Sequence, residues 1–488
     1  MVLTGEDLME RLRNANAETA CEQRLSRGTP ISMRQHAGDH ASHFEAKQIY
    51  FGLLEDGLDD LAVARSRMYL ASLLERVEPA SCDLPENPRQ LQAWSDAHTE
   101  RVGAQYRGYL RTRKAGGARQ YFAHKSHALY FLKGVAPTKL VDGAWLYGLL
   151  KHWRDPCYLP LIQTYLEELG EGISDKNHVV IYKRLLAAHG CQQWHCLSDA
   201  HFTQGAIQLA LAQHTADFLP EVIGYNLGYE QLPLHLLISA YELNELGIDP
   251  YYFTLHVTVD NASTGHATQA LRAVAEALPH VADKQGFYRR LINGYKLNDL
   301  GASTNSVIED FDLDDELVNV LAAKARVGAQ LHSDYCRIAG KTVNEWLSEP
   351  GQLPLFLDAL QEQGWIKRHQ HPEASRFWKL IQGEHAQMFG VFNAYERQVI
   401  YDWIAGDSSA EPGARAISFK ARQRLVGETL PQQEDFDTGS HVLEQKLAGA
   451  TGADDRMARL IKLISPAHHH TAPGLMATRA FTRLLHGT

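Results

Sequence analysis

Apolar residues recur at helical spacing along nearly the whole chain, and this pattern restricts the fold more than any other feature. It is clear in AKQIYFGLLEDGLDDLAVARSRMYLASLLERV (46–77), NVLAAKARVGAQLHSDYCRIAG (319–340), LPLFLDALQEQGW (353–365) and AYERQVIYDWIAG (394–406). Positions three and four apart share one face of a helix, so each stretch predicts a helix with a buried side. The strict alternation of a half-buried strand is scarce. We therefore predict an all-α fold.

Turn-forming residues divide this helical chain into parts. They gather in stretches such as ASCDLPENPRQ (80–90), RKAGGARQ (113–120) and SEPGQLP (348–354). A length of 488 residues allows two to four domains. We predict an N-terminal helical segment (1–110), a central helical-bundle core (111–345) and a C-terminal helical part (346–488).

Charge and hydropathy exclude several functional classes. The formal net charge of −10 argues against nonspecific nucleic-acid binding, which needs a basic face. No window approaches 18 uncharged apolar residues, so we expect no membrane span. The N-terminal stretch MVLTGEDLMERLRNANAE lacks the apolar centre of a signal peptide, and the six scattered cysteines suit free thiols. We expect a cytoplasmic protein.

The amphipathic stretch YFGLLEDGLDDLAVARSRMYLASLLERV (50–77) has a wider apolar face than one core needs. This excess of apolar surface leads us to expect a homodimer.

The stretch EELGEGISDKNHVV (167–180) combines carboxylates with a histidine, in a chain that has 25 histidines. Glu171 and His178 are seven residues apart, so on one helix they would share a face about 10 Å apart along the axis. Such a pair could reach one metal ion. The alternative interpretation is an exposed, acidic helix start with a chance histidine.

Two further segments carry metal-type side chains in apolar surroundings. Glu230 follows FLPEVIGYNLGY (218–229), where a carboxylate is costly unless it is paired or bound to a cation. In LHVTVDNASTGHA (255–267), His256 and Asp260 are one helical turn apart and His266 follows. His256 and Asp260 are either a structural hydrogen-bonded pair or metal ligands. Glu230 is either a residue on a helix surface or a metal ligand. Mixed oxygen and nitrogen ligands would favour iron or manganese over structural zinc.

Taken together, EGISDKNH (171–178), Glu230 and HVTVD (256–260) resemble the heme-oxygenase-like di-iron oxidases and oxygenases. That family carries E-x6-H on one core helix, a lone glutamate on the next and H-x3-D-x2-H on the third. The flanking APTKLVDGAWL (136–146) and TAPGLMATRAF (471–481) also look like long bacterial iron-containing redox enzymes. The resemblance implies Glu171, His178, Glu230, His256 and Asp260 as metal ligands.

One position departs from the family pattern. Ser263 stands where the family has its last histidine, and the nearest histidine is His266. On a regular helix, His266 would lie about 15 Å along the axis from His256 and off the ligand face. His266 could therefore be the sixth ligand only if the helix breaks around NASTG (261–265), a run of weak helix formers.

The resemblance further implies two Fe(II)/Fe(III) ions, O2 as cosubstrate, an external electron donor and a peroxo-diferric intermediate. We expect N-oxygenation of an amino acid or other small amine, because Tyr225, Asn226 and Tyr229 place polar groups near the motifs. The alternative is a di-iron oxidase that cleaves or desaturates an aliphatic acid or amino acid. A second alternative is a non-catalytic metal-binding helical protein.

Overall fold

The fold of the chain is all-α, as its apolar periodicity predicts. The computed structural model describes residues 45–487 except 56–58, 260–264, 329–331, 333–334, 407–440 and 442. Within these residues the only strands are β1 (Arg337–Ile338) and β2 (Lys341–Thr342), which form one short antiparallel pair. None of the helices in this part of the chain combines the length and the apolar character needed to cross a membrane.

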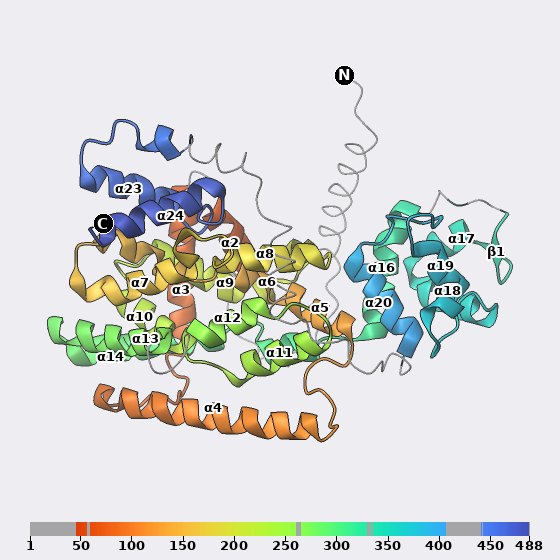
Figure 1. Ribbon diagram of the computed structural model, residues 1–488, viewed down its shortest axis with the longest axis horizontal. Coiled ribbons are helices and arrows are strands. Elements are labelled where there is room, and N and C mark those ends of the chain that lie inside the picture. Colours follow the sequence, from red (N-terminus) through yellow and green to blue (C-terminus); the bar gives the residue numbers. More distant parts are fainter. Residues whose placement is uncertain are drawn as a thin grey trace.

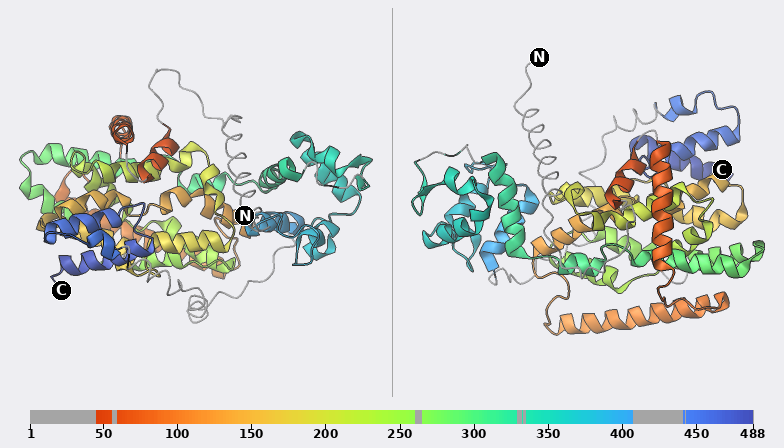
Figure 2. Two further views of the ribbon diagram at one scale, coloured as in Figure 1. Left: turned by 90° about the horizontal axis from the view of Figure 1, so that it is seen from above. Right: turned by 180° about the vertical axis from the view of Figure 1, so that it is seen from behind.

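The helices form a large body and a smaller lobe beside it (Figure 1 and Figure 2). The body contains α2 (Ala46–Leu54), α3 (Asp60–Val77), α4 (Leu91–Lys114), α5 (Lys125–Gly134), α6 (Ala136–Lys139), α7 (Leu159–Glu168), α8 (His178–Ala188), α9 (Thr203–Gln213), α10 (Leu219–Tyr229), α11 (Leu234–Glu245), α12 (Tyr251–Val259), α13 (His266–Ala277), α14 (Lys284–Lys296), α15 (Thr304–Glu309), α23 (Ala453–Leu463) and α24 (Ala472–Leu485). The lobe contains α16 (Leu313–Gly328), α17 (Val343–Leu347), α18 (Leu353–Glu362), α19 (Arg376–Ile381) and α20 (Ala394–Ala405).

Short 3₁₀ turns connect many of these helices. They are η1 (Pro88–Gln90), η2 (Ala144–His152), η3 (Pro156–Tyr158), η4 (Gly170–Gly172), η5 (Gln193–Cys196), η6 (Asp199–Phe202), η7 (Leu278–His280), η8 (Leu297–Asp299), η9 (Pro350–Gln352) and η10 (Pro372–Ala374). Two of them, η2 and η4, lie next to the buried polar residues described below.

A close crossing of α10 and α14 fixes the position of the α10 end. The two helices approach at Gly224 and Gly294: a Cβ atom on Gly224 would lie 1.8 Å from the Leu291 carbonyl oxygen, and one on Gly294 would lie 2.1 Å from that of Glu221. Only glycine permits this separation. The crossing therefore determines where the chain places Glu230, the residue that follows α10.

Segments from both ends of the described chain pack onto the body. Helix α2 lies against α9, and α3 lies against α9 and α14, so the first helices share the apolar core of the centre. Helix α24, near the C-terminus, packs beside η4 and α23, as Figure 1 shows in blue. The last helices thus pack onto the body.

Candidate metal centre

Glu171 and His178 do not share a helix. Helix α7 ends at Glu168, and the chain then takes left-handed backbone angles at Gly170, Glu171 and Gly172, with φ of 61°, 52° and 80°. A new helix, α8, begins at His178, with the Asn177 side chain capping it. Glu171 is exposed at the surface, whereas His178 is buried. The helical spacing assumed for this pair therefore does not hold, and Glu171 belongs to neither group of buried ligand-type residues.

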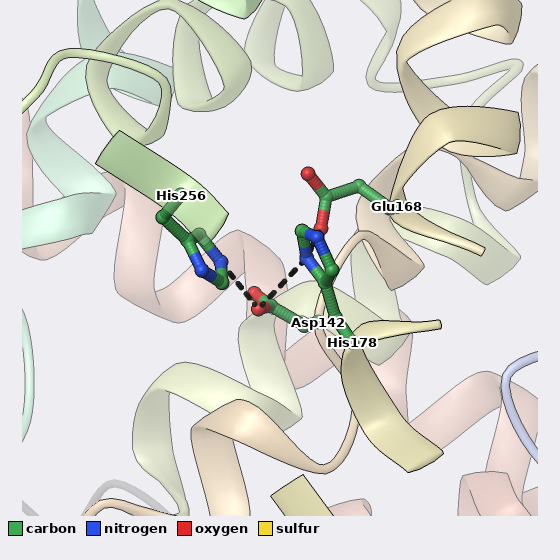
Figure 3. A group of neighbouring side chains, drawn as sticks. All are labelled: Asp142, Glu168, His178 and His256. Atoms are coloured by element: carbon green, nitrogen blue, oxygen red, sulfur yellow. Dashed lines mark hydrogen bonds and ion pairs between the residues drawn. The ribbon is translucent and has the colours of Figure 1, made fainter. Parts of the chain in front are cut away.

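Asp142, Glu168, His178 and His256 form the first group (Figure 3). Each offers one ligand-type atom, and these atoms all lie within 4.8 Å of one another. His256 Nε2 lies 3.1 Å from Asp142 Oδ2, and His178 Nδ1 lies 3.8 Å from the same oxygen. His178 Nδ1 also lies close to Glu168 Oε2. All four side chains are buried, so the group is shielded from solvent.

Two tyrosines and a glycine fix Asp142 in the turn between α6 and η2. The Tyr229 hydroxyl donates to Asp142 Oδ1 at 2.7 Å, and the Tyr252 hydroxyl donates to Oδ2. The next residue, Gly143, has a φ of 78°, and a Cβ atom on it would lie 2.9 Å from Glu168 Cβ. The backbone turn at Gly143 thus brings Asp142 and Glu168 together.

The His256 ring is oriented by its own helix. Its Nδ1 lies 2.8 Å from the carbonyl oxygen of Tyr252, one turn earlier in α12, so Nδ1 carries the hydrogen and donates it. The other nitrogen, Nε2, faces Asp142 and would be the one that binds a metal ion. A metal-binding histidine is commonly held in this way, with its other nitrogen donating to a backbone carbonyl.

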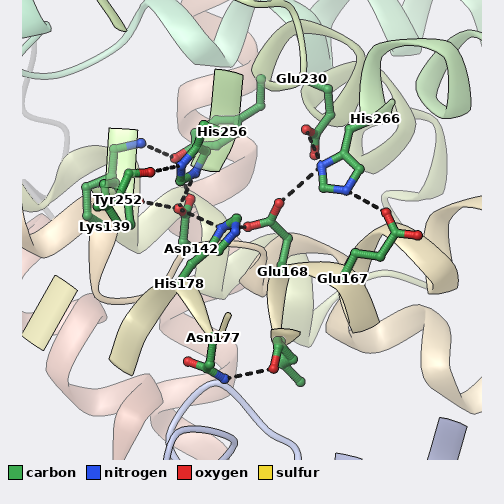
Figure 4. Close-up of polar contacts among 12 residues, drawn as sticks. Lys139, Asp142, Glu167, Glu168, Asn177, His178, Glu230, Tyr252, His256 and His266 are labelled. Atoms are coloured by element: carbon green, nitrogen blue, oxygen red, sulfur yellow. Dashed lines mark hydrogen bonds and ion pairs between the residues drawn. The ribbon is translucent and has the colours of Figure 1, made fainter. Parts of the chain in front are cut away.

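Glu168, Glu230 and His266 form a second buried group (Figure 4). His266 Nδ1 lies 3.2 Å from Glu168 Oε1 and 3.2 Å from Glu230 Oε2. On the other side of the ring, His266 Nε2 lies 2.9 Å from Glu167 Oε2. Glu168 is common to both groups, and its two oxygens face different histidines, Oε2 towards His178 and Oε1 towards His266.

His266 reaches this group because it starts a new helix. Helix α12 ends at Val259, and α13 begins at His266 after the N-cap residue Gly265. The ring is 1% exposed. Asp260, the remaining ligand expected from the sequence, and residues 261–264 lie outside the described residues.

The carboxylates and histidines of the first group shift one another's pKa values. Burial lowers the pKa of His178, but the charges of Glu168 and Asp142 outweigh burial and raise it to about 10. Burial likewise raises the pKa of Glu168 and Asp142. At Glu168, the charge and hydrogen bond of His178 outweigh the effect of burial. At Asp142, the charge of Lys139 and the contacts with His178 and His256 outweigh it. Both carboxyl pKa values therefore lie well below their usual range. Both carboxyl groups are therefore ionised.

The residues of the two groups are compatible with metal binding. Three buried carboxylates lie together, and concentrating negative charge away from water is costly unless cations compensate it. His178 Nδ1 and Glu168 Oε2 face each other at close range as an ion pair. Both atoms therefore point into the same space, as two ligands of one ion do. Carboxylate and imidazole ligands suit iron or manganese.

Sequence reasoning missed Asp142, Glu168 and Glu167. Glu167 and Glu168 are the last two residues of the apolar helix α7, and the glycines at 170 and 172 signalled that a helix could end there. Asp142 stands in the apolar run KLVDGAWL (139–146), where an ionised side chain needs a partner. That signal was available, but only the fold shows that the partners of Asp142 include His256, 114 residues later.

Comparison with known families supports an iron centre. Residues 129–294 match the model of a family described as iron-containing redox enzymes, which is heme-oxygenase-like. All six residues of the two groups lie inside the matched range. The resemblance to this family, inferred above from short motifs, is thereby confirmed for this part of the chain. No match was found among curated proteins or solved structures.

Proposed function

We propose that this chain is an O2-activating non-heme di-iron oxygenase that oxidises the nitrogen of an amino acid or another small amine. The observation that carries the proposal is Glu168, a buried carboxylate whose two oxygens face two separate groups of ligand-type residues. A carboxylate shared in this way is the arrangement that bridges two metal ions held between bundle helices.

The two groups divide into ligands for two ions. Asp142, His178 and His256 would hold one ion and Glu230 and His266 the other, with Glu168 contacting both. Bound iron would supply the electrons that reduce O2, a chemistry that these side chains lack. An external electron donor would restore the ferrous state for the next turnover.

The surrounding residues would keep this centre dry and its ligands oriented. Tyr229 and Tyr252 hold Asp142 by hydrogen bonds, and Tyr182 packs against Tyr252 in the apolar core beside them. Excluding water in this way protects a reactive centre from side reactions. Of the three polar residues near the motifs, only Tyr229 contacts the centre. Asn226 accepts from the Trp145 indole, and Tyr225 donates to Gln204.

The polar surroundings on the Asp142 side favour a small polar substrate. The half-buried Lys139 ammonium donates to the Tyr229 hydroxyl at 3.0 Å, two hydrogen bonds away from Asp142. No carboxylate of the described residues forms an ion pair with it, so this cation is suited to the carboxylate of an amino acid. A carboxylate-bearing aliphatic substrate would suit Lys139 equally, which keeps oxidative cleavage or desaturation as the second candidate.

Metal titration with a matched pair of variants tests the di-iron assignment. We expect wild-type protein to bind two Fe(II) ions per chain under anaerobic conditions. Glu168→Ala should lose both ions, because each group loses its shared ligand. Glu171→Ala, three residues away and exposed, should retain both. Equal iron binding by the two variants would refute the assignment of Glu168.

Oxygen chemistry is tested on the iron-loaded protein. Mixing the ferrous protein with O2 in a stopped-flow spectrometer should give a transient visible band that decays faster with a substrate amine. Mass spectrometry of products from a panel of amino acids should then show the addition of oxygen to nitrogen. Products shortened by a carbon fragment, or carrying a new double bond, would favour the second candidate. Ferrous protein that gives no band and consumes no O2 would favour a non-catalytic metal-binding protein.

A further inference from the structure

The C-terminal helices α23 and α24 support the chain turn that carries Glu168 and His178. The Tyr165 hydroxyl, in α7, donates to the Ile464 carbonyl at 2.7 Å. Arg479 Nε, in α24, donates to the Gly172 carbonyl at 3.0 Å. Gly172 itself lies so close to α24 that a Cβ atom on it would be 2.3 Å from the Leu475 carbonyl oxygen. The turn is therefore held from outside by the end of the chain.

Asn177 ties the two ends of this turn together. Its Nδ2 donates to the Leu169 carbonyl at 3.1 Å, directly after Glu168, and its Oδ1 accepts from the Val180 amide at 3.0 Å at the start of α8. These backbone groups determine which side of the amide is nitrogen, because the carbonyl must accept and the N–H must donate. A single buried amide thus links the residue after Glu168 to the start of the helix that carries His178.

The second hydrogen of the same Nδ2 points to the C-terminal segment. His469 Nδ1 lies 3.1 Å from it and must be the acceptor, since Asn177 Nδ2 can only donate. His469 is 1% exposed, and burial together with the charges of His470 and Lys183 holds its pKa well below the usual value. The neutral ring can accept this hydrogen bond. Figure 4 shows Asn177 close to the blue C-terminal ribbon, on the side of His178 away from His256.

We propose that His469 is a positioning residue of the metal centre: by fixing the Asn177 amide it holds Glu168 and His178 at the separation that one metal ion needs. This inference rests on the proposed function, because it assumes that Glu168 and His178 are ligands. Removing the acceptor would leave a buried N–H without a partner, which favours rotation of the amide and loosens both of its backbone contacts. Loss of such an outer contact typically weakens metal binding about 10- to 100-fold.

Three variants separate positioning from simple packing. His469→Leu keeps apolar bulk and removes the acceptor. His469→Asn places an amide oxygen near the position of Nδ1 and should restore the hydrogen bond. His470→Leu is the matched control, because its ring contacts the exposed Lys183 side chain instead, at 2.5 Å. Each protein is titrated with Co(II) alone, and the visible absorption of the bound ion is recorded.

We expect His469→Leu to bind one of two Co(II) ions about 10- to 100-fold more weakly, with an altered visible spectrum. His469→Asn should recover most of the affinity, and His470→Leu should match wild type. The thermal midpoint of metal-free His469→Leu should fall, because a buried N–H loses its partner. The altered Co(II) spectrum, which a loss of packing alone would not give, separates positioning from packing. Asn177→Asp keeps the cap of α8 but loses both donors, so it should reproduce the loss even if His469→Leu fails to fold.

Two negative outcomes are distinguishable. If wild type binds two ions and both His469→Leu and Asn177→Asp bind them equally well, the positioning role of His469 is wrong and the di-iron assignment stands. If wild-type protein binds no Co(II) and no Fe(II), the proposed function fails, and the role of His469 fails with it.

Discussion

Glu167 and Glu168, adjacent in the sequence, contact opposite sides of the His266 ring. Glu167 Oε2 lies 2.9 Å from Nε2, and Glu168 Oε1 lies 3.2 Å from Nδ1. Burial raises the pKa of Glu167, but its hydrogen bonds with His266 and Gln163 outweigh burial and lower it. The ionised Glu167 therefore holds the hydrogen on Nε2 and leaves Nδ1 able to bind a cation.

Glu167→Ala should therefore weaken binding of the second metal ion by about 10- to 100-fold while the first ion binds normally. Glu167→Gln, which keeps an acceptor oxygen, should cost less. The measurement is anaerobic Fe(II) titration of both variants, with Glu171→Ala as the exposed control. A Glu167→Ala protein that binds both ions as wild type does would show that the contact does not orient His266.

Gly224→Ala should destabilise the protein by about 1–3 kcal/mol, because the added methyl group forces α10 away from α14. That methyl carbon would lie 1.8 Å from the Leu291 carbonyl oxygen, which belongs to a helix backbone and cannot move aside. Glu230 follows α10, so iron binding should weaken as well. Urea unfolding measures the loss of stability. Gly351→Ala, where a Cβ atom meets nothing within 4 Å, is the control and should leave stability nearly unchanged.

Stability should fall in mild acid through His189. Burial and the charge of Lys125 lower its pKa to about 4. Between pH 6.5 and about 4 the unfolded chain binds a proton that the folded chain does not, so the free energy of unfolding decreases as the pH falls. The slope is at most about 1.4 kcal/mol per pH unit. His189→Gln should flatten the pH dependence of urea unfolding, and His280→Gln, at an exposed site, should not. Parallel profiles for wild type and His189→Gln would contradict this prediction.

A homodimer remains our expectation, and α3 offers a surface for it. Leu61 and Met68 are 53% and 57% exposed and lie two helical turns apart on one face. If this face joins two copies, Met68→Glu should shift the mass measured by light scattering from dimer to monomer. Leu355→Glu, at a 60% exposed site in the lobe, is the control and should leave the mass unchanged. A wild-type protein of monomer mass at all concentrations would exclude the dimer.

Local sequence patterns predicted the helices better than they predicted the buried ligand-type residues. Helical periodicity is a property of neighbouring residues, so the all-α class followed from it. The apolar settings of Glu230 and His256 also marked them as groups that need partners, and both lie in the buried groups. Glu171 was predicted as a ligand because residues 167–180 were interpreted as one helix. Three successive left-handed residues end α7 and direct Glu171 to the surface, leaving Glu168 inside.

The remaining residues could not be predicted because their roles depend on distant contacts. Asp142 meets His256 across 114 positions, and Asn177 meets His469 across 292. Neither pair has a spacing that a helix or a turn would impose. The sequence HHH at 468–470 looks like a surface loop, yet the fold buries its middle member.

The contact between Asn177 and His469 also bears on the order in which the protein is made. Every ligand-type residue of the two groups, from Asp142 to His266, leaves the ribosome long before His469 is synthesised. Contacts so distant along the chain form late, because a large loop must close first. If His469 positions the centre as proposed, the nascent chain presents its carboxylates and imidazoles before the segment that fixes their spacing exists. Their final spacing would then require the C-terminal helices.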